Sequence, residues 1–236
     1  NFSTGTVTNN GSITITSTGT FSQRGTITNN STGTVTNSGT ITITSTGTAT
    51  NSGTMTNSST GILTVNGTIT ISVGGILTNN RTITINESAG AVTNSGTIVN
   101  NAGGTITNND TVTNNVGATI QNIGTFTNSL ETTFTDNGTL TNTGLFATFV
   151  PISNYATSDG FTYTLTGSPT IASNIGVTVP SGYVLDIPIS QTLTNSGLLV
   201  VGGDMNVAGT VENDGGIIRN ENAIRNNGTL TNNSGS

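Results

Sequence analysis

Glycine recurs along the first third of the chain at intervals that alternate between six and eight residues. It stands at positions 5, 11, 19, 25, 33, 39, 47, 53, 61, 67 and 75. The repeating unit therefore has 14 residues, made of a short leg such as GTVTNN and a long leg such as GTITITST. So short a period is typical of solenoids, in which each coil cannot bury its own apolar face and successive coils stack.

Within each leg, hydroxyl and aliphatic side chains alternate. In GTITIT (39–44), Thr40, Thr42 and Thr44 point to one side, while Ile41 and Ile43 point to the other. Gly, Asn and Ser at the ends of the legs favour bends, because Gly and Asn tolerate positive φ. Strand and bend at a fixed period predict an all-β protein with the β-solenoid fold. The residues expected to face inward are Ile13, Ile15, Ile41, Ile43, Ile69 and Ile71, with Thr14, Thr42 and Thr70 outward.

The repeat leaves the length of one coil open. Coils of 14 or 28 residues would place like residues above one another, and Thr14, Thr42 and Thr70 would then form one column. A three-legged coil of about 21 residues would not stack like on like in this way. The general chirality of strand crossovers favours a right-handed coil.

Charged side chains are scarce, with four Lys plus Arg, ten Asp plus Glu, and no His or Cys. Stacked coils explain this scarcity, because columns of like charge would repel, whereas columns of Thr, Ser and Asn can hydrogen-bond. The net charge of −6 argues against nucleic acid as a partner. No apolar run reaches the length of a membrane-spanning helix. Without His or Cys there is no His-based triad and no thiolate metal site. We expect no enzyme, no cofactor and no metal.

The repeat is interrupted between residues 145 and 191. All four Pro and all three Tyr lie in this segment. We predict solenoid repeats in 1–144, a non-repeat β insertion in 145–191, and C-terminal solenoid repeats in 192–236. The bulky side chains of the insertion either fill a core or form a contact surface, since Tyr and Phe are favoured in interface cores. The candidate lateral contact consists of Tyr155, Phe161, Tyr163 and Tyr183.

Both ends of the sequence still have the repeat pattern, as NFSTGTVTNN and GTLTNNSGS. The last coil of a solenoid exposes edge strands that can pair with another chain. We therefore expect the first and last coils of different copies to stack head to tail, with the arginines setting the register against acidic residues of the next copy. The candidate assembly interface consists of Val7, Ile13, Ile224, Leu230, Arg219 and Arg225.

Tandem strings such as GTVTNSGTIT (33–42) resemble those of repetitive surface proteins of bacteria and archaea. These include the haemagglutinin-like and autotransporter β-helix adhesins and the subunits of extracellular filaments. The resemblance extends over residues 1–144 and 192–236. It implies an extracellular, structural or adhesive protein at the cell surface.

Three functions fit these features. The first is a structural subunit of an extracellular fibre or sheath, whose partner is itself. The second is an adhesin stalk in which residues 145–191 contact a cell or abiotic surface. The third is an ice-binding solenoid, since rows of Thr-x-Thr can order water. Such rows occur on both types of leg, as at Thr26/Thr28 and Thr34/Thr36, rather than on one side. We favour the first function; a protein that is monomeric in solution would point to the second.

Overall fold

The computed structural model of the chain describes residues 5–130, 132–158 and 160–233. Within these ranges the protein is built of short strands, and the one helical element is a 3-10 turn, η1, at Ile152–Asn154. The chain divides into two compact units, Asn1–Phe146 (unit 1) and Ala147–Ser236 (unit 2). Strand β21 (Leu145–Pro151) crosses the boundary between them.

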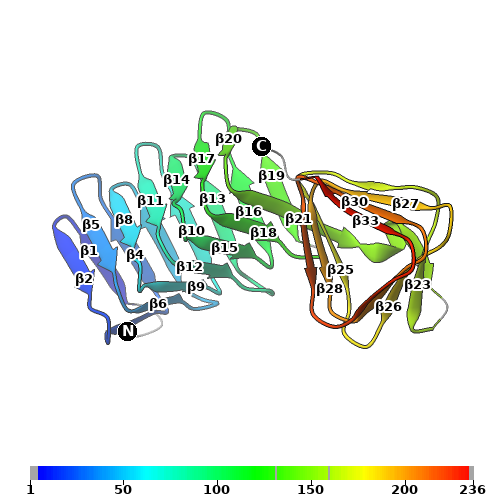
Figure 1. Cartoon of the computed structure of the whole chain (residues 1–236). Coiled ribbons are helices and arrows are strands. Elements are labelled where there is room, and N and C mark those ends of the chain that lie inside the picture. Colours follow the sequence, from blue (N-terminus) through cyan, green and yellow to red (C-terminus); the bar gives the residue numbers. More distant parts are fainter. Residues whose placement is uncertain (1–4, 131, 159, 234–236) are drawn as a thin grey trace. The chain divides into compact units, whose positions relative to one another are not determined.

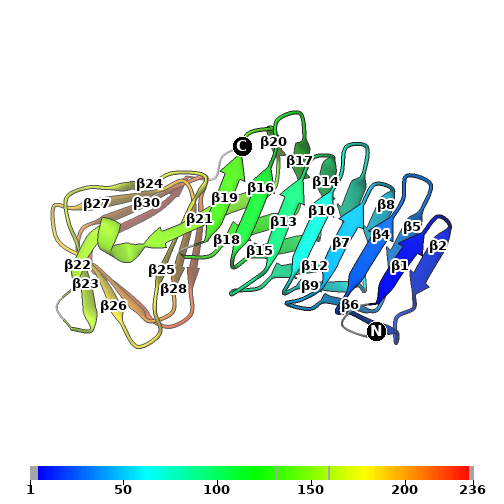
Figure 2. The same ribbon diagram turned by 180° about the vertical axis from the view of Figure 1, so that it is seen from behind.

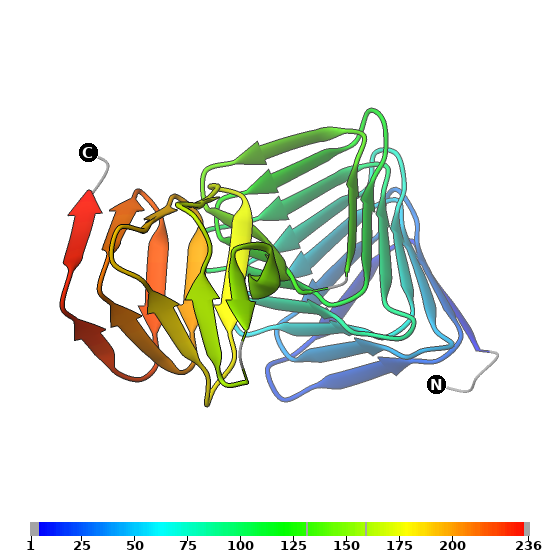
Figure 3. The same cartoon turned by 90° about the vertical axis from the view of Figure 1, so that its right-hand side faces the viewer.

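Unit 1 winds through three parallel sheets, each of which takes every third strand (Figures 1 and 2). Sheet A holds β1 (Thr6–Asn9), β4 (Thr26–Asn29), β7 (Thr48–Asn51), β10 (Thr68–Ile71), β13 (Ala91–Asn94), β16 (Thr111–Asn114) and β19 (Thr133–Asp136). Sheet B holds β2 (Ser12–Ile15), β5 (Thr34–Asn37), β8 (Thr54–Asn57), β11 (Ile76–Asn79), β14 (Thr97–Asn100), β17 (Thr119–Asn122) and β20 (Thr139–Asn142). Sheet C holds β3 (Thr20–Gln23), β6 (Thr40–Ile43), β9 (Ile62–Val65), β12 (Thr82–Ile85), β15 (Thr105–Asn108), β18 (Thr125–Asn128) and the start of β21. The three sheets surround one apolar core, mostly aliphatic, with Phe126 and Phe146 in its last coils (Figure 3).

Each coil of unit 1 closes after three legs. Thr6 pairs with Thr26, and Thr26 pairs with Thr48, so successive coils take 20 and then 22 residues. The expectation that a coil of this length could not stack like on like is wrong. Every leg contains the same four-residue strand, and the two additional residues of a long leg lie in the turn that follows it. The right-handed coil stays a prediction.

The predicted alternation of inward and outward side chains is confirmed. Ile15, Ile41, Ile43, Ile69 and Ile71 are buried in the core, and Ile13 packs against it from the first coil. Thr14, Thr42 and Thr70 face outward.

The predicted column of these three Thr residues is wrong, because they lie on three different sheets. Thr14 belongs to sheet B, Thr42 to sheet C and Thr70 to sheet A. The neighbour of Thr14 is Thr36, and that of Thr42 is Thr64. The columns still consist of like residues, but their members are one three-legged coil apart.

The repeat glycines are needed for close contact between coils rather than for a positive φ. Among the described residues, positive φ occurs at other glycines, such as Gly74 and Gly103, and at Ser88 and Ser190. A Cβ on Gly53 would lie under 3.0 Å from the carbonyl oxygens of the preceding coil. The expectation that these turns rest on left-handed backbone is therefore wrong at the repeat glycines.

Four turns of unit 1 carry a residue other than Gly at the glycine position: Arg81 and Asp110 in two-residue turns, and Ala118 and Thr132 in longer ones. After Arg81 and Asp110 the ladder hydrogen bonds are long, at 3.4 Å from Thr82 N to Gly61 O and 3.3 Å from Thr111 N to Gly90 O. The corresponding bond from Thr54 N, after a glycine, measures 3.0 Å. After Ala118 and Thr132 the bonds are 2.9 Å (Thr119 N to Gly96 O) and 2.7 Å (Thr133 N to Asp110 O), so the lengthening is confined to the two-residue turns that carry Arg81 and Asp110.

Unit 2 has a coil of similar construction with a more varied sequence. Its first sheet contains β21, β25 (Ile175–Val179), β28 (Leu198–Val201) and β31 (Ile217–Asn220). The second contains β22 (Ala156–Ser158), β23 (Thr162–Leu165), β26 (Val184–Ile187), β29 (Asp204–Val207) and β32 (Ile224–Asn226). The third contains β24 (Thr170–Ile171), β27 (Thr192–Asn195), β30 (Thr210–Asp214) and β33 (Thr229–Asn233). Strand β22 pairs antiparallel to β23, and the strands that continue these sheets pair in parallel.

Strands from the segment 145–191 pair with strands from the C-terminal repeats. Residue Gly176 of β25 pairs with Leu198, Val184 of β26 with Asp204, and Thr170 of β24 with Thr194. The core of unit 2 draws on both segments and is almost wholly aliphatic. The domain boundaries placed after residues 144 and 191 stay predictions.

Candidate functional site: interaction surfaces

Buried rows of Asn run through unit 1. In sheet B the row contains Asn37, Asn57, Asn79, Asn100 and Asn122, each at most 1% exposed. The Nδ2 of each donates to the Oδ1 of the Asn in the next coil, over 2.6 to 2.9 Å. The row therefore has a direction, with its donors pointing toward the C-terminal coils.

The same side chains also bind the backbone, so few of their hydrogen-bonding groups are left unsatisfied. Nδ2 of Asn57 donates to the carbonyl oxygen of Thr82 at 2.9 Å. Oδ1 of Asn37 accepts from the amide of Gly39 at 3.2 Å. Because a buried polar group without partners costs free energy, these bonds allow a polar residue to line the inside of the solenoid.

The sequence predicted columns of Asn that hydrogen-bond to one another, but the burial of these rows was missed because Asn was assigned to the bends. The alternation within the strand was the signal that could have found them. In a strand such as TVTN (34–37), the second and fourth side chains point to the same face. An Asn in the fourth position therefore shares the inner face with the aliphatic residue in the second.

The residues predicted for the assembly interface lie on the outermost described coils. Val7 and Ile13 are on β1 and β2 and are only partly buried. Ile224 and Leu230, on β32 and β33, are 42% and 44% exposed, whereas Met205 in the preceding coil is fully buried. These two side chains border an open hollow of about 240 Å³, whose lining is completed by Met205, Asn213, Ile218, Thr231 and Asn232.

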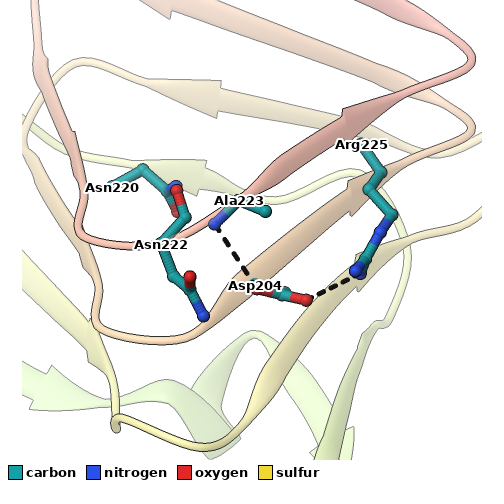
Figure 4. Close-up of polar contacts among 5 residues, drawn as sticks. All are labelled: Asp204, Asn220, Asn222, Ala223 and Arg225. Carbon is teal, nitrogen blue, oxygen red and sulfur yellow. Dashed lines mark hydrogen bonds and ion pairs between the residues drawn. The ribbon is translucent and has the colours of Figure 1, made fainter.

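Both predicted interface arginines have acidic partners within their own chain. Arg225 Nη1 lies 2.6 Å from Asp204 Oδ2, and the Ala223 amide donates to the other oxygen of that carboxylate at 3.4 Å (Figure 4). Arg219 Nη2 lies 2.9 Å from Glu221 Oε1. Exposed pairs of this kind contribute about 0–1 kcal/mol. Their predicted role in setting the register against another copy stays a prediction.

Three of the four residues predicted for lateral contact form an aromatic cluster on unit 2. The ring of Tyr183 lies 5.6 Å from that of Phe161 and 5.3 Å from that of Tyr163. Phe161 is 72% exposed, while both Tyr rings pack partly against the core. Tyr155 packs against the same core, and burial raises the pKa of its hydroxyl. The lateral contact itself stays a prediction.

The described residues contain neither a cluster of three metal-binding side chains nor a helix that could cross a membrane. No group of three acidic side chains among them is placed to hold a metal ion. A hollow of about 440 Å³ at a corner of unit 1 is lined, among the described residues, by Glu87, Ser88, Asn109, Asp110 and Leu130, two of which carry carboxylates. None of the described helical structure is long and apolar enough to cross a membrane.

Stacked coils of one recurring strand, closed by glycine turns, define the chain as a parallel β-solenoid repeat protein. The model of the haemagglutinin repeat family matches residues 1–53, 44–101, 88–144 and 191–234. Because these matches take in most of the sequence, the chain belongs to the haemagglutinin repeat family. It is an adhesin-type repeat protein of the secreted or cell-surface kind.

Among solved structures, the chain is similar to a TibC-catalysed, hyperglycosylated fragment of TibA. The two are 18% identical over 98% of this chain and 92% of that one, with a TM-score of 0.21. At this TM-score the similarity carries no argument about the arrangement of the coils or about glycosylation of this chain. Among curated proteins, no sequence matches this chain.

Proposed function

We propose that this chain is a structural subunit of an extracellular fibre or sheath that lengthens by head-to-tail stacking of solenoid coils. The observation that supports it most is that the outermost described coils consist of edge strands. Strands β1, β2 and β3, and at the other extreme β31, β32 and β33, are the edge strands of their sheets. Such edges offer unpaired backbone groups, and here they also frame half-covered aliphatic side chains.

The direction of the Asn rows supports a head-to-tail order. In unit 1, Asn9 Nδ2 donates to Asn29 Oδ1 at 2.8 Å, so the first group of that row is an acceptor oxygen. In unit 2, Asn213 Nδ2 donates to Asn232 Oδ1 at 2.7 Å, so the last group of that row is a donor nitrogen. Stacking the donor end of one copy on the acceptor end of another continues the row. Stacking two like ends would oppose donors to donors or acceptors to acceptors.

A second function, an adhesin that holds a non-self surface, is favoured by the aromatic cluster. Phe161 exposes most of its ring beside Tyr183, and large aromatic side chains are enriched at the centres of interfaces. The two functions differ in their partner. A fibre subunit associates with itself as its concentration rises, whereas an adhesin tip stays monomeric without its target surface.

Removing one outward-pointing amide tests the fibre. The first residue of β4, Thr26, donates its amide back to Gly5 O at 2.9 Å. By alternation, Thr6 and Thr8 of β1 direct their amides away from β4, toward a preceding coil. Thr8→Pro deletes such a donor without breaking a bond to β4. Thr8→Ala keeps the amide and is the matched control.

We expect the wild type and Thr8→Ala to form oligomers and filaments, measured by sedimentation velocity and negative-stain microscopy. Thr8→Pro should reduce association at least tenfold, with circular dichroism and melting temperature close to those of the wild type. Filaments of Thr8→Pro equal to those of the wild type would show that coil stacking through β1 is not the assembly contact. A wild type that stays monomeric at every concentration would reject self-assembly and favour the adhesin.

A further inference from the structure

The outer face of sheet A carries a two-column array of Thr. In each of its seven strands, the first and third residues point outward. Thirteen of these fourteen positions are Thr, and Ala91 is the exception. The columns are Thr6, Thr26, Thr48, Thr68, Ala91, Thr111 and Thr133, and Thr8, Thr28, Thr50, Thr70, Thr93, Thr113 and Thr135.

The other two faces of unit 1 are less regular. Ser12, Ile76, Val99 and Gln121 interrupt the array on sheet B, and Ser22 and Ile62 interrupt it on sheet C. The sequence suggested that Thr-x-Thr rows have no preferred side because they occur on both types of leg. This argument against one Thr-rich face does not hold for a three-legged coil. With an odd number of legs, short and long legs alternate on every sheet, so both contribute to the same face.

Sheet A also holds its Thr side chains at fixed spacings. Adjacent strands of a sheet lie about 4.8 Å apart, and residues i and i+2 of a strand about 6.6 Å apart. Most of the Thr residues are partly buried between their neighbours, and β-branched side chains have few χ1 rotamers. Thr48 Oγ1 donates to Thr26 Oγ1 at 3.2 Å, within one column. The hydroxyl and methyl groups therefore form a regular lattice.

We propose that the outer face of sheet A binds ice, a function beyond fibre assembly. A face of an ice crystal is a flat lattice of hydrogen-bonding water molecules, and a two-dimensional lattice of hydroxyls with similar spacings can hold the first water layer in register. None of the fourteen outward positions is charged, so no ionic hydration shell disturbs that layer. A crystalline polysaccharide is also flat and regular, but its sugar rings stack on aromatic faces, and none of the fourteen positions is aromatic.

One coil supplies a matched set of substitutions. Thr50 on sheet A, Thr56 on sheet B and Thr64 on sheet C are each the third residue of a strand and each half-buried. Lys at any of them adds a long charged side chain, but only Thr50→Lys breaks the array of sheet A. Thermal hysteresis and partition into a slowly growing ice hemisphere are the measurements, with folding checked by circular dichroism. If Thr50→Lys does not fold, Thr70→Lys in the next coil replaces it.

We expect the wild type to show thermal hysteresis and to partition into ice. Thr50→Lys should lower both at least fivefold, while Thr56→Lys and Thr64→Lys stay close to the wild type. A wild type excluded from ice without hysteresis overturns the proposal. Equal effects of all three substitutions overturn the assignment to sheet A. Binding to crystalline cellulose that Thr50→Lys abolishes, with no partition into ice, would assign the face to a polysaccharide and overturn ice binding.

Discussion

Units 1 and 2 are both built of three-sheet coils, but they differ in the residue at the fourth, inward-facing position of their strands. In unit 1 this fourth position holds long rows of Asn in sheets A and B, such as the one that joins Asn37 to Asn122 in sheet B, whereas in sheet C it also holds buried Ile43, Val65 and Ile85. In unit 2 the same position holds buried Val179, Ile187, Val201 and Val207, and one shorter row from Asn195 to Asn232. The unit with the polar rows is also the unit whose sequence repeats most closely.

The difference gives sequence repetition a physical reason. An Asn within a row, such as Asn79, exchanges hydrogen bonds with the Asn at the same height in the coil on each side, so a row favours identical coils and a single register. An aliphatic residue at that position makes no directional bond, and Val, Ile or Leu can replace one another with small changes of packing. Unit 2 could therefore diverge in sequence while its coil geometry persisted.

The largest expected effect comes from a charge in the core of one unit. Ile43 is 1% exposed in unit 1, and Ile43→Asp buries an unpaired carboxylate there, at a cost of several kcal/mol. We expect unit 1 to lose protection in hydrogen exchange, while amides around Ile187 in unit 2 stay protected. Thr42→Asp, on the outward side of the same strand, is the control and should fold. If both units lose protection together, they do not behave as two separate cores.

A smaller effect distinguishes an Asn that lies within a row from an Asn that begins one. Asn79 accepts from the Arg81 amide at 3.3 Å and donates to Asn100 Oδ1 at 2.8 Å. Asn79→Val leaves both of those groups buried without that partner, and should lower the free energy of unfolding by about 2–4 kcal/mol. Urea denaturation with a fluorescent or hydrogen-exchange probe in each unit measures the loss.

Asn195 in unit 2 is the matched position, because it begins a row rather than lying within one. It stacks on Ile171, and within the described part of the chain its buried Oδ1 has no hydrogen-bond partner. Asn195→Val removes this unsatisfied acceptor as well as the bond to Asn213, so the two effects partly offset each other. We expect a change within about 1 kcal/mol. Equal losses at Asn79 and Asn195 would contradict the view that rows depend on both neighbours.

Much of the fold could be predicted from the sequence, because alternation and glycine spacing act locally. In the strand TITI (40–43), the alternation of side chains alone places Ile41 and Ile43 inside and Thr42 outside, as the structure has them. The number of legs in a coil could not be predicted in this way. It depends on the angle at each corner, and a repeat of two legs is compatible with a coil of three. The column proposed for Thr14, Thr42 and Thr70 failed for this reason.

The candidate sites were harder to predict than the fold. The exposed aliphatic side chains of Ile224 and Leu230 follow from their place in the last described coil, which the repeat pattern showed. The partners of Arg219 and Arg225 depend on which strands become neighbours, and so on the coil length that the sequence left open. The same is true of the Thr array on sheet A, which exists only once the legs are sorted onto three faces.

A further comparison concerns a feature that both units share, the glycine at which coils approach each other. A Cβ on Gly53 in unit 1 would collide with Gly33 O and Asn30 O, and one on Gly209 in unit 2 with Pro188 O and Gln191 O. We therefore expect Gly53→Ala and Gly209→Ala to destabilise their units by similar amounts, about 1–3 kcal/mol each, in urea denaturation. A large loss in unit 1 alone would mean that the coils of unit 2 are not held by the same backbone contact.

Gly11 is the matched control for Gly53, since both end a two-residue turn between sheets A and B. No atom lies within 4 Å of a Cβ built on Gly11, because no described coil precedes it. Gly11→Ala should therefore leave stability unchanged or raise it by about 0.4–1 kcal/mol. If another copy stacks on this coil, however, the new methyl group meets its backbone as it would at Gly53. Sedimentation velocity should then show weaker association of Gly11→Ala at unchanged melting temperature. Association as strong as that of the wild type would mean that any coil stacked there does not make the contact seen between coils within unit 1.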